Sequence, residues 1–162
     1  MARTGTEKAG PKAAPVKPVA TNRKAHHDYF IEDRAEAGLV LTGTEVKSLR
    51  EGRAQLKDSY VQFRDGEAFL VSAHISPYDA GSWTNHLPER DRKLLMHRRE
   101  HKKFADQAFE KGLTLVPLKM YFKEGRAKVL LGICKGKQKH DKRESLKARD
   151  SKRDIDRAMR RR

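Results

Sequence analysis

The sequence contains one string whose residue types and spacing could form a catalytic metal site. His97, Glu100 and His101 match the H-x-x-E-H pattern of one class of zinc proteases. In such a site two neutral imidazoles on one helix face bind zinc, and the glutamate serves as the general base. The sequence offers no evident scaffold for a third ligand, and neighbouring cations oppose the binding of a dication: Arg98, Arg99, Lys102 and Lys103. We therefore expect no metal site at this string.

Other catalytic strings are not found in the sequence. It has no Walker A string, no G-x-G-x-x-G string that opens a helix and no G-x-S-x-G nucleophile elbow. Cys134, the only cysteine, ends an apolar stretch and is expected to pack in the interior. Seven scattered histidines leave open an RNA-processing enzyme that uses two of them. We expect a protein that is not an enzyme and needs no cofactor.

The distribution of charge favours a polyanionic partner. The 162 residues include 37 Lys and Arg against 22 Asp and Glu, which gives a net charge of +15 and a pI near 10.1. Residues 1–25 carry +5 and residues 135–162 carry +8, whereas the segment between them carries only +2. A nearly neutral body with two basic ends is typical of proteins that bind nucleic acid.

The composition also indicates the cellular compartment in which the protein works. A single cysteine excludes an internal disulfide framework and suits a reducing cytosol. No apolar run approaches the roughly 20 residues that span a bilayer. Residues 1–25 lack the apolar stretch of a signal peptide. We expect a cytoplasmic protein with no membrane partner.

The strongest binding features in the body are a basic segment and several aromatic residues. Residues 90–103 hold seven Lys and Arg side chains that could follow a phosphate backbone, and within them we assign Arg92 and Lys93 to RNA binding. Trp83 lies in a loop of Gly, Ser and Asn and is expected to be exposed. Five aromatic side chains could stack on unpaired bases, with core packing as the alternative: Tyr29, Phe30, Tyr78, Trp83 and Tyr121.

The pattern along the chain predicts three regions. Residues 1–21, rich in Ala, Pro, Lys and Gly, are predicted to be a disordered basic extension. Residues 22–134 are predicted to form an OB-like RNA-binding domain. Residues 135–162 are predicted to form a basic C-terminal tail that is disordered when free and helical on a polyanion, because it has few apolar residues to dock.

Local patterns in residues 22–134 predict two hairpins. The first pairs 60–64 with 68–71 around Asp65-Gly66, a dipeptide that favours a tight primed turn. The second pairs 114–121 with 127–134, and Pro117 is expected at an edge or a bulge because it cannot donate to a ladder.

The remaining elements complete the predicted fold. Residues 27–32 and 38–42 are predicted to be strands, and 44–52 a short helix that ends at Gly52. Residues 90–111 are predicted to be helical, either as one bent helix or as two. About six short strands with two or three helices predict a mainly β, α+β fold: a small OB-like antiparallel β-barrel with flanking helices.

Eleven strings of the sequence, read in order, resemble one family, the SsrA-binding proteins (small protein B). The resemblance runs over roughly residues 22–160. The strings that carry it are Asn22–Ala25, His27–Glu32, Glu36–Gly38, Gly43–Arg50, Asp58–Tyr60, His74–Tyr78, Arg92–Leu95, Lys111–Gly112, Lys128–Val129, Lys135–Lys137 and His140–Arg143.

The resemblance implies an RNA-binding factor with an OB-like fold and no active site. Members of the family bind the tRNA-like domain of transfer-messenger RNA (tmRNA) and bring it to stalled ribosomes, where the protein replaces the missing anticodon arm. Their C-terminal tail becomes helical in the empty mRNA channel of the small subunit. The process, trans-translation, tags the nascent peptide and frees the ribosome. Elongation factor Tu and alanyl-tRNA synthetase are expected partners through the shared tmRNA.

The resemblance also implies roles for individual residues. By position, Asn22, Glu36, Leu95 and Lys128 match residues that bind the tRNA-like domain. Met96 departs from the usual Leu, and His101 stands where an apolar residue is more usual. The residues expected near the decoding centre and in the mRNA channel are Lys135, Lys137, His140, Asp141, Lys142 and Arg143. A generic OB-fold RNA-binding translation factor stays open as an alternative, as does the His-dependent RNA-processing enzyme.

Overall fold

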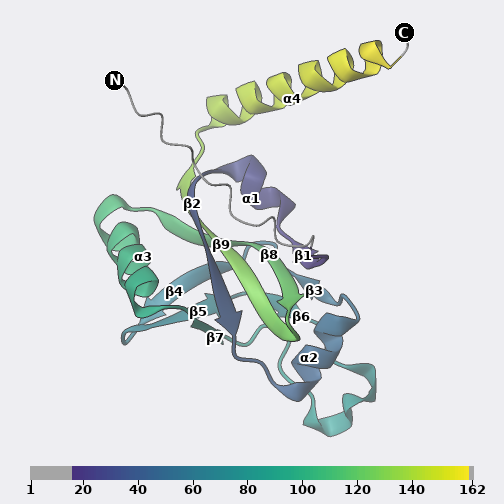
Figure 1. The fold of residues 1–162 in the computed structure, drawn as a ribbon, viewed down its shortest axis with the longest axis vertical. Helices are drawn as coiled ribbons and strands as arrows, with labels where there is room; N and C mark the ends of the chain where they lie inside the picture. Colours follow the sequence, from purple (N-terminus) through teal and green to yellow (C-terminus); the bar gives the residue numbers. More distant parts are fainter. Residues whose placement is uncertain (1–15, 161–162) are drawn as a thin grey trace, which may run out of the picture.

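The computed structural model describes residues 16–160, and its main feature is one bent sheet of seven antiparallel strands (Figure 1). In spatial order the strands are β1 (Pro18–Thr21), β8 (Thr114–Lys123), β9 (Arg126–Gly136), β2 (Tyr29–Leu39), β7 (Arg92–Leu95), β5 (Glu67–Val71) and β4 (Tyr60–Arg64). Strand β4 lies against β8, so the sheet curls on itself in the manner of an OB-like barrel. The strands β3 (Ala54–Gln55) and β6 (His74–Ile75) form a small second sheet.

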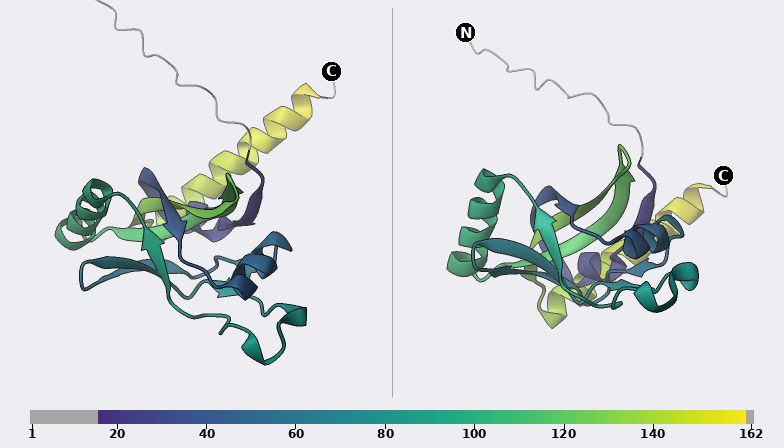
Figure 2. Two further views of the ribbon diagram at one scale, coloured as in Figure 1. Left: turned by 60° about the horizontal axis from the view of Figure 1, so that its bottom comes forward. Right: turned by 90° about the horizontal axis from the view of Figure 1, so that it is seen from below.

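Helices flank the sheet at its ends. They are α1 (Arg23–Asp28), α2 (Gly43–Arg50), the 3-10 helix η1 (Asp79–Thr84), α3 (Arg98–Lys111) and α4 (Lys139–Met159). In both views of Figure 2, α2 and α3 lie at opposite ends of the sheet. Helix α4 follows β9 and extends away from the sheet beside α1 (Figures 1 and 2). The mainly β architecture with flanking helices predicted from the sequence is confirmed.

Strand β8 separates two hydrophobic clusters. Leu115 and Met120 belong to the main core inside the curled sheet. Val116 and Leu118 face the other way and pack with Ala25 of α1 in the second cluster. The second cluster also buries Cys134, as predicted, and burial raises the pKa of its thiol to about 11. A strand covered on both faces reads as a continuous apolar run, which explains the composition of β8.

Both predicted hairpins are confirmed with their turns. Strands β4 and β5 pair from Tyr60–Val71 to Arg64–Glu67, and Asp65 and Gly66 both have positive φ. Strands β8 and β9 join at Glu124-Gly125, which also have positive φ. Their register shifts between Pro117 and Lys119, so Pro117 lies at a bulge.

The helix predicted over residues 90–111 is wrong in its first part. Arg92–Leu95 form β7, which pairs with β2 on one side and β5 on the other. Along β7 the side chains of Arg92 and Leu94 are buried whereas those of Lys93 and Leu95 are not, which is the two-residue period of a strand. The helix begins only at Arg98 and ends before Gly112, whose φ of 59° gives the left-handed conformation of a C-cap.

Two further predictions differ from the structure near the start of the described chain. Residues 27–32 were predicted as a strand, but His27 and Asp28 end α1 and β2 begins at Tyr29. Parts of the predicted strands over 27–32 and 38–42 belong to one long strand, β2, which ends at Leu39, so residues 40–42 are not part of a strand. The predicted disordered extension over 1–21 includes Pro18–Thr21, yet these residues form β1, which is stabilised by its ladder with β8. Residues 1–15 of that extension lie outside the described residues.

The C-terminal tail is helical in the structure from Lys139 to Met159. Residues 135 and 136, which the sequence analysis placed in the tail, complete β9 instead. The disorder predicted for the free tail stays a prediction.

Candidate nucleic-acid interface

Three predicted RNA-binding residues, Glu36, Leu95 and Lys128, meet on three neighbouring strands. Glu36 lies on β2, Leu95 on β7 and Lys128 on β9. Gly38 of β2 pairs with both Leu95 and Lys128, which puts these two on either side of β2 at one level. The three side chains line one pocket, here called the Glu36 pocket: Glu36, Leu95, Met96, His97, Glu100 and Lys128.

The carboxylate of Glu36 is held by partners from two other strands. The Tyr121 hydroxyl donates to Oε2 at 2.5 Å, Lys123 Nζ lies 3.3 Å from Oε1, and Lys128 Nζ lies 4.0 Å from Oε1. The Tyr121 hydrogen bond, with Lys123 and Lys128, holds the pKa of Glu36 below its ordinary value although partial burial opposes this. Glu36 is therefore an oriented anion at neutral pH that can accept hydrogen bonds from base amino groups or ribose hydroxyls.

Leu95 gives the Glu36 pocket an exposed apolar rim. Its side chain is 53% exposed, although the flanking Leu94 belongs to the core. Gly38 lies beside it, and a Cβ there would come within 3.4 Å of Leu95 Cβ. Lys93, two residues before Leu95, pairs with Glu67 across the ladder to β5 and is partly exposed. A partly exposed cation on the same strand as an apolar rim suits contact with a phosphate and a base or sugar.

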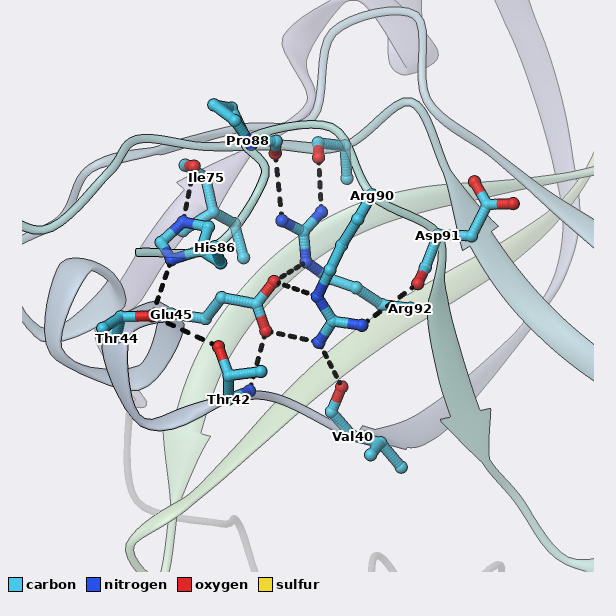
Figure 3. Close-up of polar contacts among 11 residues, drawn as sticks. Val40, Thr42, Thr44, Glu45, Ile75, His86, Pro88, Arg90, Asp91 and Arg92 are labelled. Atoms are coloured by element: carbon cyan, nitrogen blue, oxygen red, sulfur yellow. Dashed lines mark hydrogen bonds and ion pairs between the residues drawn. The ribbon is translucent and has the colours of Figure 1, made fainter. Parts of the chain in front are cut away.

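Arg92 is not an RNA-contacting residue, and its assignment from the basic segment is wrong. Its guanidinium is fully buried, and Nε donates to Glu45 Oε1 at 2.8 Å while the other nitrogens donate to Ala73 O and Pro88 O (Figure 3). Arg90 donates to the same carboxylate at 2.7 and 2.6 Å. Charge alone could not separate a structural arginine from an RNA-binding one.

Glu45 is the centre of this network and ties α2 to β7. Its carboxylate also accepts from the Thr42 N–H at 2.8 Å, which caps α2 (Figure 3). Burial by itself raises the pKa of Glu45, but Arg90, the Thr42 N–H and Arg92 more than offset this, so the pKa lies below its ordinary value. The network fixes β7, the strand that carries Leu95 into the Glu36 pocket.

Asn22 lies apart from the Glu36 pocket and serves the fold. Its side chain is buried, and Nδ2 donates to Leu56 O and Pro117 O at 3.0 and 3.1 Å. Its Oδ1 accepts from Ala25 N at 3.1 Å and caps α1. The structure therefore gives Asn22 a positioning role for α1, and a direct contact with RNA stays a prediction.

The start of the tail, from Lys137 to Lys142 in the first turns of α4, is attached to α1 and the start of β2. The Lys137 N–H donates to Asp28 O at 2.9 Å, and Lys137 Nζ lies 3.3 Å from His26 O and 4.8 Å from the Phe30 ring centroid. Lys142 Nζ pairs with Asp28 Oδ1 at 3.1 Å. The hydrogen bond from His27, together with Lys142, holds the pKa of Asp28 below its ordinary value, although burial opposes this. Polar contacts thus join the tail to the body.

The predicted tail residues divide between this attachment and the open surface. Asp141 accepts from the Gln138 N–H at 3.1 Å and so caps the start of α4. Lys142 is held by Asp28, whereas Lys135 and Arg143 are exposed. His140 lies in the first turn of α4.

The structure places the two histidines of the H-x-x-E-H string in different surroundings. His97 precedes α3 and lines the Glu36 pocket, whereas the ring of His101 packs edge-on against Phe63 with centroids 5.1 Å apart. Within residues 16–160 no group of three or more His, Cys, Asp or Glu side chains is arranged to hold a metal ion. Of the helices in the described part of the chain, none has the length and apolar character needed to cross a membrane.

Sequence reasoning missed Tyr121 and Lys123 as partners of Glu36. The sequence predicts Tyr121 only as a base-stacking or core residue, and Lys123 falls between the two predicted strands of the second hairpin, 114–121 and 127–134. A signal was present, because residues two apart on one strand share a face and β8 pairs with the strand that carries Lys128. The pairing of β9 with β2, which completes the site, is not local and could not be read from either hairpin.

The curled antiparallel sheet with flanking helices defines a protein of the OB-like class, and the carboxylate, cation and apolar rim on one face are groups that can contact RNA. The comparisons with known proteins agree. The sequence model of the SmpB protein family matches residues 19–161. The chain belongs to the SmpB family, whose members, the SsrA-binding proteins, are RNA-binding factors and not enzymes.

Individual relatives match over nearly their whole length. The chain is 58% identical to the SsrA-binding protein of Geobacillus kaustophilus (strain HTA426) over 146 residues, which cover 90% of this chain and 94% of that one. It is 55% identical to the SsrA-binding protein of Limosilactobacillus reuteri (strain DSM 20016) over 141 residues, which cover 87% and 90%. A solved structure described as "tmRNA-SmpB: a journey to the center of the bacterial ribosome" superposes with a TM-score of 0.64 at 48% identity and covers 82% of this chain and 95% of that one.

Proposed function

We propose that this chain binds the tRNA-like domain of tmRNA through the Glu36 pocket and carries it to stalled ribosomes in trans-translation. The observation that carries the proposal is the meeting of Glu36, Leu95 and Lys128 on three strands, because only the folded sheet brings them together. Membership of the SmpB family and the likeness to a tmRNA-SmpB structure support it.

The tail has a separate task in this proposal. The body stands in for the anticodon arm, and α4 occupies the empty mRNA channel with residues 140–143 near the decoding centre. The extension of α4 away from the sheet supports this, because an extended basic helix can enter a channel while the Glu36 pocket holds RNA (Figure 1). Nascent-peptide tagging and release of the ribosome follow from the delivered tmRNA.

Two partners and a compartment complete the proposal. Elongation factor Tu and alanyl-tRNA synthetase join the complex through the shared tmRNA rather than through a surface of this chain. The setting is the cytoplasm, where stalled ribosomes and tmRNA occur together.

The test is binding of the full chain to three RNAs at matched salt. The isolated tRNA-like domain of tmRNA should bind more tightly than an ordinary tRNA and than a random single strand of equal length. Equal affinity for all three with equal salt slopes would leave only a generic OB-fold RNA binder and would overturn the proposal. Glu36→Gln is the informative variant, with Glu32→Gln on the same strand as the matched control.

A further inference from the structure

The side chain of Trp83 is 91% exposed, more than any other large apolar side chain in the described part of the chain. It lies in η1, in the loop between β6 and β7. An indole carries a large apolar area, and leaving it in water has no benefit for folding. Exposure alone does not imply a partner, but an indole held in a fixed position is well suited to stack against one.

The loop that carries Trp83 is held in one conformation. The Asn85 amide closes it, accepting from the Tyr78 N–H at 2.9 Å and donating to Tyr78 O at 2.7 Å. Gly81 N also donates to Tyr78 O at 2.8 Å, and Thr84 Oγ1 donates to Gly81 O at 2.8 Å. Ser82, directly before Trp83, has φ 48° and ψ −139°, a conformation that costs energy for a residue with a side chain. The loop thus presents Trp83 at little further cost in entropy when a partner binds.

Two cations on α2 are available to an anionic partner, and one of them, Lys47, lies against Tyr78 at the start of this loop. Lys47 and Arg50 are exposed on α2, and within residues 16–160 neither forms an ion pair with an acid. Lys47 Nζ lies 5.3 Å from the Tyr78 ring centroid, and the Arg50 guanidinium lies 6.0 Å from that of Phe122. Tyr78 and Phe122 are themselves partly buried, so the exposed ring is Trp83. An exposed indole on a loop whose neighbouring helix carries exposed cations is a combination that can bind unpaired nucleotides by stacking and charge.

A hollow leads from the Glu36 pocket to α2, the helix that carries Lys47 and Arg50. A neighbouring pocket shares Leu95 and Lys128 with it and reaches Val46 of α2, next to Lys47; its lining residues also include Leu39, Leu41 and Arg126. An RNA on the Glu36 pocket that continues along this hollow meets α2 and then the loop. Because the hollow joins the Glu36 pocket to α2, the RNA that binds the pocket is favoured over a different molecule as the ligand of the Trp83 loop.

We propose that the Trp83 loop is a second contact for the tRNA-like domain, in which an unpaired base stacks on the indole while Lys47 and Arg50 follow the backbone. This inference rests on the proposed function, because it takes the RNA of the Glu36 pocket as the ligand.

The experiment uses the fact that the chain holds one tryptophan. Fluorescence of the full chain reports on Trp83 alone when the excitation wavelength is one that its four tyrosines do not absorb. Titration with the isolated tRNA-like domain should then quench the emission and protect Trp83 from acrylamide. Trp83→Ala should weaken binding about tenfold in a gel-shift assay, whereas Trp83→Phe should retain most of the affinity because a ring remains for stacking. Phe109→Ala, which removes a ring 76% exposed on α3, is the matched control and should leave the affinity unchanged.

The outcomes separate this inference from the proposed function. Tight, selective binding with Trp83 still open to acrylamide would overturn only the inference. Protection of Trp83 that appears only after ribosomes are added would also overturn it, because the occupant would then belong to the ribosome. Loss of selective binding by the unaltered chain would overturn the proposed function itself.

Discussion

The body and the tail of this protein are both suited to RNA, but they are stabilised in different ways. The Glu36 pocket is built from three paired strands, and its carboxylate has three partners before any ligand arrives. Along α4, by contrast, residues 147–159 are exposed, and the ion pairs there join residues of the helix itself, Asp150 with Arg153 and Asp154 with Arg157. Such exposed pairs contribute little to stability. The comparison indicates that the body recognises a folded RNA by preorganised groups, whereas the tail depends on its surroundings for order.

The strongest test of this comparison removes the tail. A chain that stops after Gln138 keeps β9 complete and also keeps Lys137, which attaches to α1. We expect it to bind the tRNA-like domain but to release no stalled ribosomes, which a peptide-tagging assay with tmRNA measures. Normal tagging by this variant would contradict the separate task of the tail.

The next largest effect concerns the buried network that positions β7. Glu45→Ala leaves the buried Arg92 without its carboxylate and should lower the free energy of unfolding by about 3–5 kcal/mol, measured by urea denaturation. Asp154→Ala on α4 removes the exposed ion pair with Arg157 and should leave the free energy of unfolding unchanged. An equal loss in both variants would show that body and tail do not differ as described.

The same network predicts a dependence of stability on pH. The pKa of Glu45 in the folded chain is below its ordinary value. Ionised Glu45 therefore stabilises the fold fully above its pKa in the unfolded chain, about 4.3. This stabilisation is lost as the pH falls through the pKa of Glu45 in the folded chain. Urea unfolding of Glu45→Gln between pH 7 and pH 3 should therefore show a weaker acid dependence than the unaltered chain. An identical acid dependence would rule out this role of Glu45.

A smaller effect is expected at the Glu36 pocket. Tyr121→Phe removes the hydroxyl that orients Glu36 and should weaken binding of the tRNA-like domain by about three- to tenfold without changing stability much. Glu36→Gln should cost more, because the charge is lost as well. Tyr60→Phe, at an exposed tyrosine on β4, is the matched control for the binding measurement. Unchanged affinity in Tyr121→Phe would mean that the hydroxyl does not orient the site.

The smallest effect concerns Cys134, two residues before the end of β9. Burial raises the pKa of its thiol to about 11, so iodoacetamide at pH 8 should leave the folded chain unmodified, and the reaction should follow only unfolding in urea. The chain that stops after Gln138 should be equally protected, as mass spectrometry would show. Rapid alkylation of that chain would mean that the body needs the tail to stay packed.

Much of the fold was predictable because its signals are local. The Asp65-Gly66 turn, the bulge at Pro117 and the end of α3 at Gly112 each follow from the conformations available to one or two residues. Strand β7 was not predictable, because Arg92–Leu95 has a helix-compatible composition and becomes a strand only through its ladders with β2 and β5. The short α1 was missed for a similar reason, since its cap, Asn22, is fixed by distant carbonyls.

The site was predictable in part. The resemblance supplied Glu36, Leu95 and Lys128, and the structure brings them together. Charge alone put Arg92 among the RNA contacts, although its partner Glu45 lies 47 residues away in the sequence. A buried ion pair with that separation leaves no local pattern, so the structural use of this arginine appears only in the folded chain.

The most direct test of the division between body and tail compares the full chain with the chain that stops after Gln138. Both are titrated with the tRNA-like domain and with an ordinary tRNA at two salt concentrations. We predict that removal of the tail lowers both affinities and the salt slope but leaves the preference for the tRNA-like domain unchanged. A preference that disappears with the tail would show that recognition lies in the tail and not in the Glu36 pocket.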